Sequence, residues 1–125
     1  MTEMLERTRL EHVCRLDQLT PGLGVAALID EVQVAVFLIE TGEVYAVSNL
    51  CPFSGASVIS RGITGSRLGD PTVASPVYKQ VFSLVTGECL ATMDKKPKPG
   101  LEPHLTSYPV VVGDGQVYVL VSRPS

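Results

Sequence analysis

Few side chains in this sequence of 125 residues are suited to catalysis or metal binding. The two histidines, His12 and His104, lie far apart in the sequence, and neither is near an acidic motif that could complete a catalytic triad. Gly22-Leu23-Gly24 lies between predicted strands and does not open a helix, so it matches no phosphate-binding or dinucleotide-binding loop. The residues alone therefore predict no active site. One open possibility is a small-molecule or metal site that combines Cys51 with the two histidines.

The composition excludes several classes of protein. A chain of this length has room for one domain, and 45% hydrophobic with 18% charged residues excludes a mainly disordered chain. No apolar run approaches the roughly 20 residues of a membrane span. The formal charge of -3 and the lack of a long basic cluster make nucleic acid and anionic membranes unexpected partners. The N-terminus does not resemble a signal peptide and the three cysteines are widely spaced, so we expect a cytoplasmic protein with reduced thiols.

Valine-rich segments separated by glycine and proline predict short β-strands rather than long helices. We expect a tail over residues 1–10, a single domain over 11–122 and a second tail over 123–125. The fold class expected is an all-β sandwich or barrel of about nine or ten short strands with little helix. The clearest predicted strands cover residues 11–16, 24–29, 33–39, 43–48, 73–76, 80–84, 108–112 and 116–121.

Two segments predict irregular structure. Residues 61–71 contain three glycines and a proline without any apolar period, which is typical of a surface loop. Residues 93–103 contain three lysines and three prolines, so we expect an extended, polyproline-like excursion, because proline cannot join a central strand ladder.

Two loops of this all-β pattern resemble the cluster-binding loops of Rieske proteins. In that family the first loop reads Cys-x-His with a following Gly-Ala, and the second reads Cys-Pro-x-His followed by an aromatic residue, a leucine and a Thr-Gly turn. The present sequence keeps that frame in both loops. The first loop retains Cys51, Gly55 and Ala56, and the second retains Pro76, Phe82, Leu84, Thr86 and Gly87. The resemblance implies a Rieske-like fold.

The resemblance does not extend to the ligands of a Rieske cluster. Such a [2Fe-2S] centre takes two thiolates on one iron and two imidazoles on the other. The matching positions here are Cys51, Phe53, Ser75 and Tyr78, which leaves one of the four ligands. The resemblance therefore implies that this chain binds no cluster.

Over residues 13–121 the sequence is also similar to the small subunits of assimilatory NAD(P)H-dependent nitrite reductases. The shared motifs include Leu-x-x-Leu-x-Pro-Gly at Leu16 to Gly22, Gln-Val-Ala-Val-Phe at Gln33 to Phe37, and Ser-Pro-x-x-Lys at Ser75 to Lys79. Two features depart from that family. Cys51 stands where an acidic residue is usual, and the segment from Lys95 to Glu102 is longer and richer in proline.

This resemblance implies an accessory role without catalytic residues on this chain. In that family a separate large subunit carries FAD, a [4Fe-4S] cluster and sirohaem, oxidises NAD(P)H and reduces nitrite to ammonium. The small subunit would assist or stabilise it, and candidate docking residues are Phe53, Arg61, Tyr78 and Lys79. In an alternative interpretation Phe53 and Tyr78 only fill the space left by the missing cluster. Other hypotheses are a ferredoxin-like Rieske electron carrier, the Rieske-like domain of an oxygenase system and a free-standing binding module.

Overall fold

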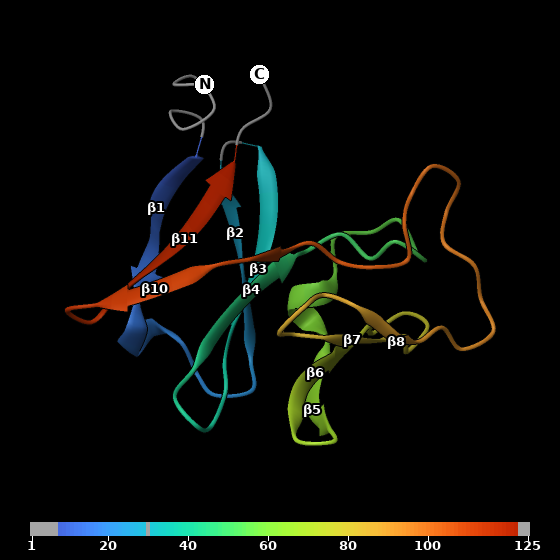
Figure 1. The fold of residues 1–125 in the computed structure, drawn as a ribbon, viewed down its shortest axis with the longest axis horizontal. Helices are drawn as coiled ribbons and strands as arrows, with labels where there is room; N and C mark the ends of the chain where they lie inside the picture. Colours follow the sequence, from blue (N-terminus) through green and yellow to red (C-terminus); the bar gives the residue numbers. More distant parts are fainter. Residues whose placement is uncertain (1–7, 30, 123–125) are drawn as a thin grey trace.

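The computed structural model describes residues 8–29 and 31–122 (Figure 1). Short antiparallel strands make up nearly all of the regular structure, with two single-turn 3₁₀ helices between them. The elements are β1 Thr8–Arg15, η1 Leu16–Gln18, β2 Gly24–Ile29, β3 Val32–Leu38, β4 Val44–Ser48, η2 Ile59–Arg61, β5 Ile63–Arg67, β6 Asp70–Ala74, β7 Val81–Ser83, β8 Cys89–Ala91, β9 Ser107–Tyr108, β10 Val110–Gly113 and β11 Gln116–Ser122.

The strands form three sheets. The first has the order β1-β11-β10, the second β2-β3-β4-β9 and the third β5-β6-β7-β8. The first and second sheets lie together at one end of the molecule, and the third lies beyond the second at the other end (Figure 1). The all-β fold class is confirmed, with somewhat more strands than the expected nine or ten.

The second sheet separates two hydrophobic cores, because successive side chains of a strand point to opposite faces. From β3, Val34 and Val36 join an aliphatic core with Val117 and Val119 of β11. The alternate residue Phe37 joins the other core. The aliphatic core thus packs the first sheet on the second, and the other core packs the third sheet and the Rieske-like loops on the opposite face.

The predicted surface loop at residues 61–71 is wrong. These residues form most of a hairpin in which Ile63 pairs with Ala74 and Arg67 pairs with Asp70. Its turn residues, Leu68 and Gly69, have φ values of 53° and 89°, as the tight turns that join hairpin strands require. The sequence gives little sign of β5 because its side chains are mostly exposed and include Thr, Gly, Ser and Arg.

Other boundaries also differ from the sequence-based expectation. The first strand begins at Thr8 rather than Glu11, so residues 8–10 of the predicted tail belong to β1. The rest of that tail, residues 1–7, and the predicted tail at 123–125 lie outside the described residues. The short strands β8 and β9 were not predicted. Within the described part of the chain, no helix is long and apolar enough to cross a membrane.

Residues 93–103 contain no helix or strand, but they are not uniformly extended. Met93 and Asp94 have φ values of 55° and 59°, and Gly100 has 83°, so the chain turns twice where a polyproline-like path was expected. Backbone hydrogen bonds attach this segment to the domain. Lys98 donates to the Pro52 carbonyl at 2.8 Å and, just beyond the segment, Leu105 donates to the Gly87 carbonyl at 2.8 Å.

Candidate functional site

The two Rieske-like loops, residues 49–56 and residues 75–80, are closed by the same pair of backbone hydrogen bonds. In the first loop the Cys51 amide donates to the Ala56 carbonyl and the Gly55 amide donates back to the Cys51 carbonyl, both at 2.8 Å. In the second, the Ser75 amide donates to Gln80 at 2.8 Å and the Lys79 amide donates to Ser75 at 3.0 Å. The loops therefore present Cys51 and Ser75 at equivalent positions of one backbone frame.

The first loop directs its side chains inward. Cys51 is fully buried and Phe53 is 3% exposed. The Phe53 ring lies 6.2 Å, centroid to centroid, from the ring of Phe82 on β7. Phe53 is therefore a core residue that joins the first loop to the third sheet. The expectation that Phe53 lies on a docking surface is wrong, because a side chain this deeply buried cannot contact a partner.

Polar groups surround the sulfur of Cys51. Burial alone would raise the pKa of its thiol. Hydrogen bonds from the Ser75 and Ser54 hydroxyls and from the backbone of Ser54 and Phe53 outweigh burial, so the pKa lies below its ordinary value. Cys51 and Ser75 are both fully buried, and the Ser75 hydroxyl is the first of the groups that lower the pKa of the Cys51 thiol.

The second loop directs its side chains outward. Val77 and Tyr78 are 43% and 42% exposed, and Lys79 is exposed as well. The Lys95 ammonium lies 4.8 Å from the centroid of the Tyr78 ring, a distance at which a cation is attracted to the face of an aromatic ring. Tyr78 therefore remains accessible, so it does not fill the interior as Phe53 does.

Arg61, the remaining candidate docking residue, is exposed at the end of η2. That helical turn packs against β2 and β3. Among the described residues, no hydrogen bond or ion pair connects Arg61 with Tyr78 or Lys79. The structure thus places Tyr78 and Lys79 side by side in the second loop and Arg61 on a separate element, η2.

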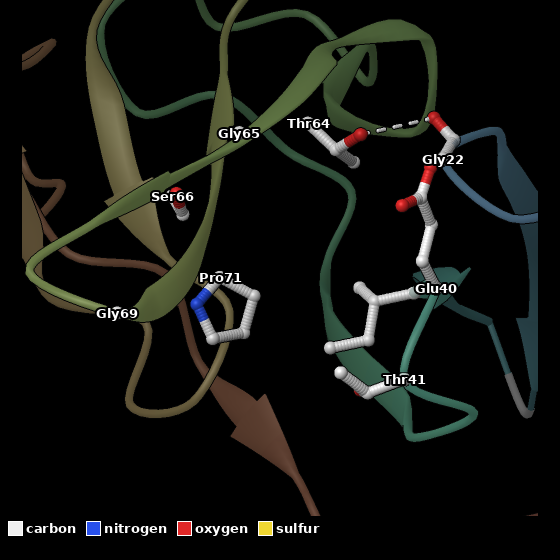
Figure 2. A pocket seen from close by; sticks show the side chains of 9 residues that line it. Gly22, Glu40, Thr41, Thr64, Gly65, Ser66, Gly69 and Pro71 are labelled. Atoms are coloured by element: carbon white, nitrogen blue, oxygen red, sulfur yellow. Dashed lines mark hydrogen bonds between the residues drawn. The ribbon is translucent and has the colours of Figure 1, made fainter.

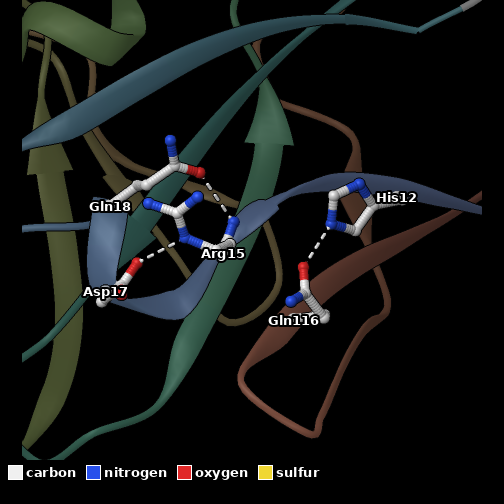
Figure 3. Close-up of polar contacts among 5 residues, drawn as sticks. All are labelled: His12, Arg15, Asp17, Gln18 and Gln116. Carbon is white, nitrogen blue, oxygen red and sulfur yellow. Dashed lines mark hydrogen bonds and ion pairs between the residues drawn. The ribbon is translucent and has the colours of Figure 1, made fainter.

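The two histidines have separate environments. The ring of His12 shares a hydrogen bond of 2.7 Å with the Gln116 side chain (Figure 3). Its centroid lies 5.4 Å from that of the Tyr118 ring, in a T-shaped arrangement. His104 accepts a hydrogen bond of 3.0 Å from the Cys89 amide through Nδ1. In residues 8–29 and 31–122, no group of three or more His, Cys, Asp or Glu side chains could hold a metal ion. The described residues therefore give no support to a metal site that combines Cys51, His12 and His104.

The close-up of His12 also shows how β1 ends. The Arg15 amide donates to the Gln18 side chain at 2.8 Å, and the Arg15 guanidinium pairs with Asp17 at 3.0 Å (Figure 3). These contacts close η1 and concern the local turn rather than a ligand.

A cavity of about 350 Å³ lies between the β5–β6 hairpin and the chain after β3 (Figure 2). Glu40 is its charged side chain, and the Thr64 hydroxyl at its edge donates to the Gly22 carbonyl at 3.3 Å. A second hollow of about 360 Å³ is lined by residues that include Tyr45, Val85 and Tyr108. In the first cavity, no hydrogen bond joins the Glu40 carboxylate to a hydroxyl of the described lining residues.

Comparison with known proteins places this fold. The family model described as a Rieske-like [2Fe-2S] domain matches residues 9–120. The small subunit of NADH nitrite reductase from Salmonella typhimurium is 43% identical over 81 residues, which are 64% of this chain and 75% of that protein. The chain belongs to the family of nitrite reductase small subunits. A crystal structure of a family member, an NADH-dependent nitrite reductase small subunit from Mycobacterium tuberculosis, superposes with a TM-score of 0.80 at 40% identity and covers 94% of this chain and 98% of that one.

Two other relatives extend the comparison beyond separate small subunits. In the large subunit of a Klebsiella oxytoca nitrite reductase, a segment amounting to 10% of that protein is 37% identical to 87% of this chain. The ferredoxin subunit of a 3-phenylpropionate/cinnamic acid dioxygenase from Photorhabdus laumondii is 34% identical over 89% of this chain and 93% of that protein. The small-subunit family thus shares its fold with electron carriers of oxygenases.

The residues present do not fit the cluster after which the wider family is named. A Rieske centre needs two thiolates and two imidazoles. At the four matching positions this small subunit has one thiol, Cys51, with the packed ring of Phe53, the hydroxyl of Ser75 and the exposed phenol of Tyr78. Phenylalanine has no lone pair for iron, and serine and tyrosine oxygens are a poor substitute for thiolate and imidazole.

Sequence reasoning missed two features next to these loops. Gln80 is fully buried; its Nε2 donates to the Thr92 carbonyl at 3.4 Å, and its Oε1 has no hydrogen-bond partner. The segment over residues 93–103 contacts both loops, through Lys95 on Tyr78 and Lys98 on Pro52. The density of lysine in that segment was the only available sign of the second feature.

Proposed function

We propose that this chain is an accessory subunit of NADH-dependent nitrite reductase that assists or stabilises the large catalytic subunit and holds no [2Fe-2S] cluster. The observation that carries the proposal is the pair of loops. Their backbone closure is intact, but Phe53 packs against Phe82 and Tyr78 lies at the surface where ligands would be expected. A loop frame that is kept without its ligands is better suited to a structural or docking role than to electron transfer.

The comparisons support a large subunit as the partner. In the Klebsiella relative, a segment similar to this chain belongs to the same polypeptide as a nitrite reductase large subunit. We therefore infer that FAD, the [4Fe-4S] cluster and sirohaem lie on a large subunit, where nitrite is reduced to ammonium. All three cysteines of this chain are free, which fits the reducing cytoplasm where we expect the complex.

The docking surface in this proposal includes Tyr78 and Lys79, with Arg61 as an outlying candidate. Tyrosine is enriched among residues that contribute most to interfaces, because it offers a large apolar area and a polar end. Tyr78 is accessible for such a contact at 42% exposure, whereas Phe53 stabilises the loop from within.

The cluster part of the proposal is tested by metal analysis of freshly purified protein. We expect iron and acid-labile sulfide far below two atoms of each per chain, and no visible absorption from an iron-sulfur centre. Stoichiometric iron that is lost in Cys51→Ser but retained in Cys14→Ser would overturn this part. That result would favour the alternative of a ferredoxin-like electron carrier, since the chain is also similar to a dioxygenase ferredoxin subunit.

The partner part is tested by mixing the chain with the large subunit from the same cell. We expect a stable complex on size-exclusion chromatography, and either faster NADH-dependent nitrite reduction or slower thermal inactivation of the large subunit. A mixture that elutes as two separate proteins, with activity and inactivation unchanged, would contradict the accessory role.

A further inference from the structure

All four lysines of the sequence lie in two segments that contact each other, since the Lys95 ammonium lies over the Tyr78 ring. Lys79 belongs to the second loop, and Lys95, Lys96 and Lys98 belong to the segment over residues 93–103. All four side chains are exposed. The chain as a whole has a formal charge of -3. Its lysines nevertheless lie close together in these two segments, although the protein is acidic overall. A local charge of this kind suggests selection for a partner of opposite charge.

The segment that carries three of these lysines is fastened to both loops and to β8. The Lys98 amide donates to the Pro52 carbonyl at 2.8 Å, and its aliphatic stem lies against Gly55. The Lys95 ammonium lies over the Tyr78 ring. Farther along, His104 accepts from the Cys89 amide, and Leu105 is buried at 4% exposure. The lysines are therefore presented from a fixed backbone, which reduces the entropy lost when a partner binds.

These lysines are also available for a partner. In residues 8–29 and 31–122, the ion pairs are Arg9 with Glu11 at 3.8 Å and Arg15 with Asp17 at 3.0 Å. None of the four lysines pairs with a carboxylate of this described part, although Asp94 and Glu102 lie in the same segment. The two paired arginines are on β1, which lies at the opposite end of the molecule from the lysine segment (Figure 1).

We propose that Lys79, Lys95, Lys96 and Lys98, together with Tyr78, form a basic docking surface for an acidic face of the nitrite reductase large subunit. This inference rests on the proposed function and adds the charge of the partner surface and the segment over residues 93–103. Tyr78 supplies the apolar contact at the centre of this basic docking surface, and the lysines supply long-range attraction and orientation at its edge. Exposed charges of this type act mainly on the rate of association, and salt weakens their effect.

The test compares two double variants with the same change in net charge. Lys95→Glu/Lys96→Glu reverses two lysines of the basic docking surface, and Arg9→Glu/Arg67→Glu reverses two exposed arginines elsewhere. Binding to the purified large subunit is measured by surface plasmon resonance at two or more salt concentrations. Circular dichroism and thermal unfolding check that each variant is folded.

We expect the lysine variant to associate at least about tenfold more slowly at low salt and to show a weaker dependence on salt. The arginine variant should remain close to the wild-type protein. Equal effects of both variants would mean that only net charge matters and would overturn the inference. An unchanged lysine variant would overturn it as well, while leaving the accessory role intact.

Two further outcomes separate this inference from its basis. A wild-type chain that does not bind the large subunit at all would overturn the proposed function, and the inference with it. If the lysine variant still binds the large subunit but no longer binds a DNA duplex, used as a polyanion probe, to which the wild-type chain does bind, the basic docking surface belongs to nucleic acid instead.

Discussion

The two Rieske-like loops have the same backbone closure and opposite side-chain directions. In the first loop Cys51, Pro52 and Phe53 are buried, whereas in the second Val77, Tyr78 and Lys79 are exposed. Both loops reverse through a residue with positive φ, Gly55 at 77° and Lys79 at 69°. One backbone frame can thus be kept for two purposes. The first loop has become part of the core, and the second has remained part of the surface.

The two cores differ in the same sense. The aliphatic core between the first and second sheets contains no phenylalanine, whereas the core beneath the loops contains Phe37, Phe53 and Phe82 with Cys51. Large aromatic side chains bury a large apolar area, and each buried Å² of it contributes about 25 cal/mol to stability. The loop end of the molecule is thus stabilised by rings where a Rieske protein also has metal-ligand bonds.

Truncating the Phe53 side chain of the first loop should have the largest effect on stability. We expect Phe53→Ala to lower the free energy of unfolding by about 3–5 kcal/mol, because it removes the contact with Phe82 and leaves a cavity. Urea denaturation measures the change, and Phe53→Leu, which refills part of the space, should cost less. A loss below about 1 kcal/mol for Phe53→Ala would show that the first loop is not a core element.

The matching truncation in the second loop should act on binding instead. We expect Tyr78→Ala to change the free energy of unfolding by no more than about 0.5 kcal/mol, since the side chain is exposed, and to weaken binding to the large subunit at least about tenfold. Tyr78→Phe keeps the ring and should stay near the wild-type affinity. Loss of stability with unchanged affinity would indicate that both loops serve the core.

Substitutions at the two residues with positive φ, Gly55 and Lys79, should change the stability in opposite directions. Gly55→Ala should destabilise the protein by about 1 kcal/mol, because a residue with a Cβ atom is strained at this φ even though the added atom would only touch Lys98. Lys79→Gly should stabilise it by up to about 1 kcal/mol, since relief of that strain is partly offset by the freedom of glycine in the unfolded chain. Thermal unfolding checks both signs, and two changes in the same direction would contradict the equivalence of the loops.

Removing the Ser75 hydroxyl beside Cys51 should have the smallest effect of the four changes. Ser75→Ala removes one hydrogen bond to the Cys51 sulfur and should raise the pKa of that thiol. Because the folded-state pKa is depressed, Cys51 contributes stability above the unfolded-state pKa, near 9.0, and this contribution is lost as the pH falls through the folded-state value. Ultraviolet titration of the thiolate in a Cys14→Ser/Cys89→Ser background measures the pKa. A lower pKa in Ser75→Ala would contradict this contact.

Most of the fold could be predicted where strands alternate in burial and turns carry strong signals. The β10–β11 hairpin followed from Gly113-Asp114-Gly115, and Asp114 and Gly115 indeed have positive φ. The β5–β6 hairpin escaped because its exposed strand has no apolar alternation and its turn begins with Leu68, a residue that rarely adopts positive φ. β8 and β9 are too short to produce a period.

The site was predictable in part. The resemblance to Rieske proteins located both loops, but sequence could not tell which aromatic residue faces inward. That choice depends on Phe82, which lies on a strand of the third sheet and meets Phe53 only in the folded state. The contact of Lys95 with Tyr78 likewise depends on turns at Met93 and Asp94 that break the expected polyproline path.

The pairing of β1 with β11 has a consequence for how this domain can be connected to other domains. Thr8 and Ser122 are register partners at the end of the first sheet, so the chain enters and leaves the fold at adjacent points. A domain with neighbouring ends can be joined within a longer polypeptide, or produced separately, without rearranging its sheets. The same domain can therefore be expected as a free-standing subunit in one lineage and as a segment of a fused protein in another, as the Salmonella and Klebsiella relatives illustrate.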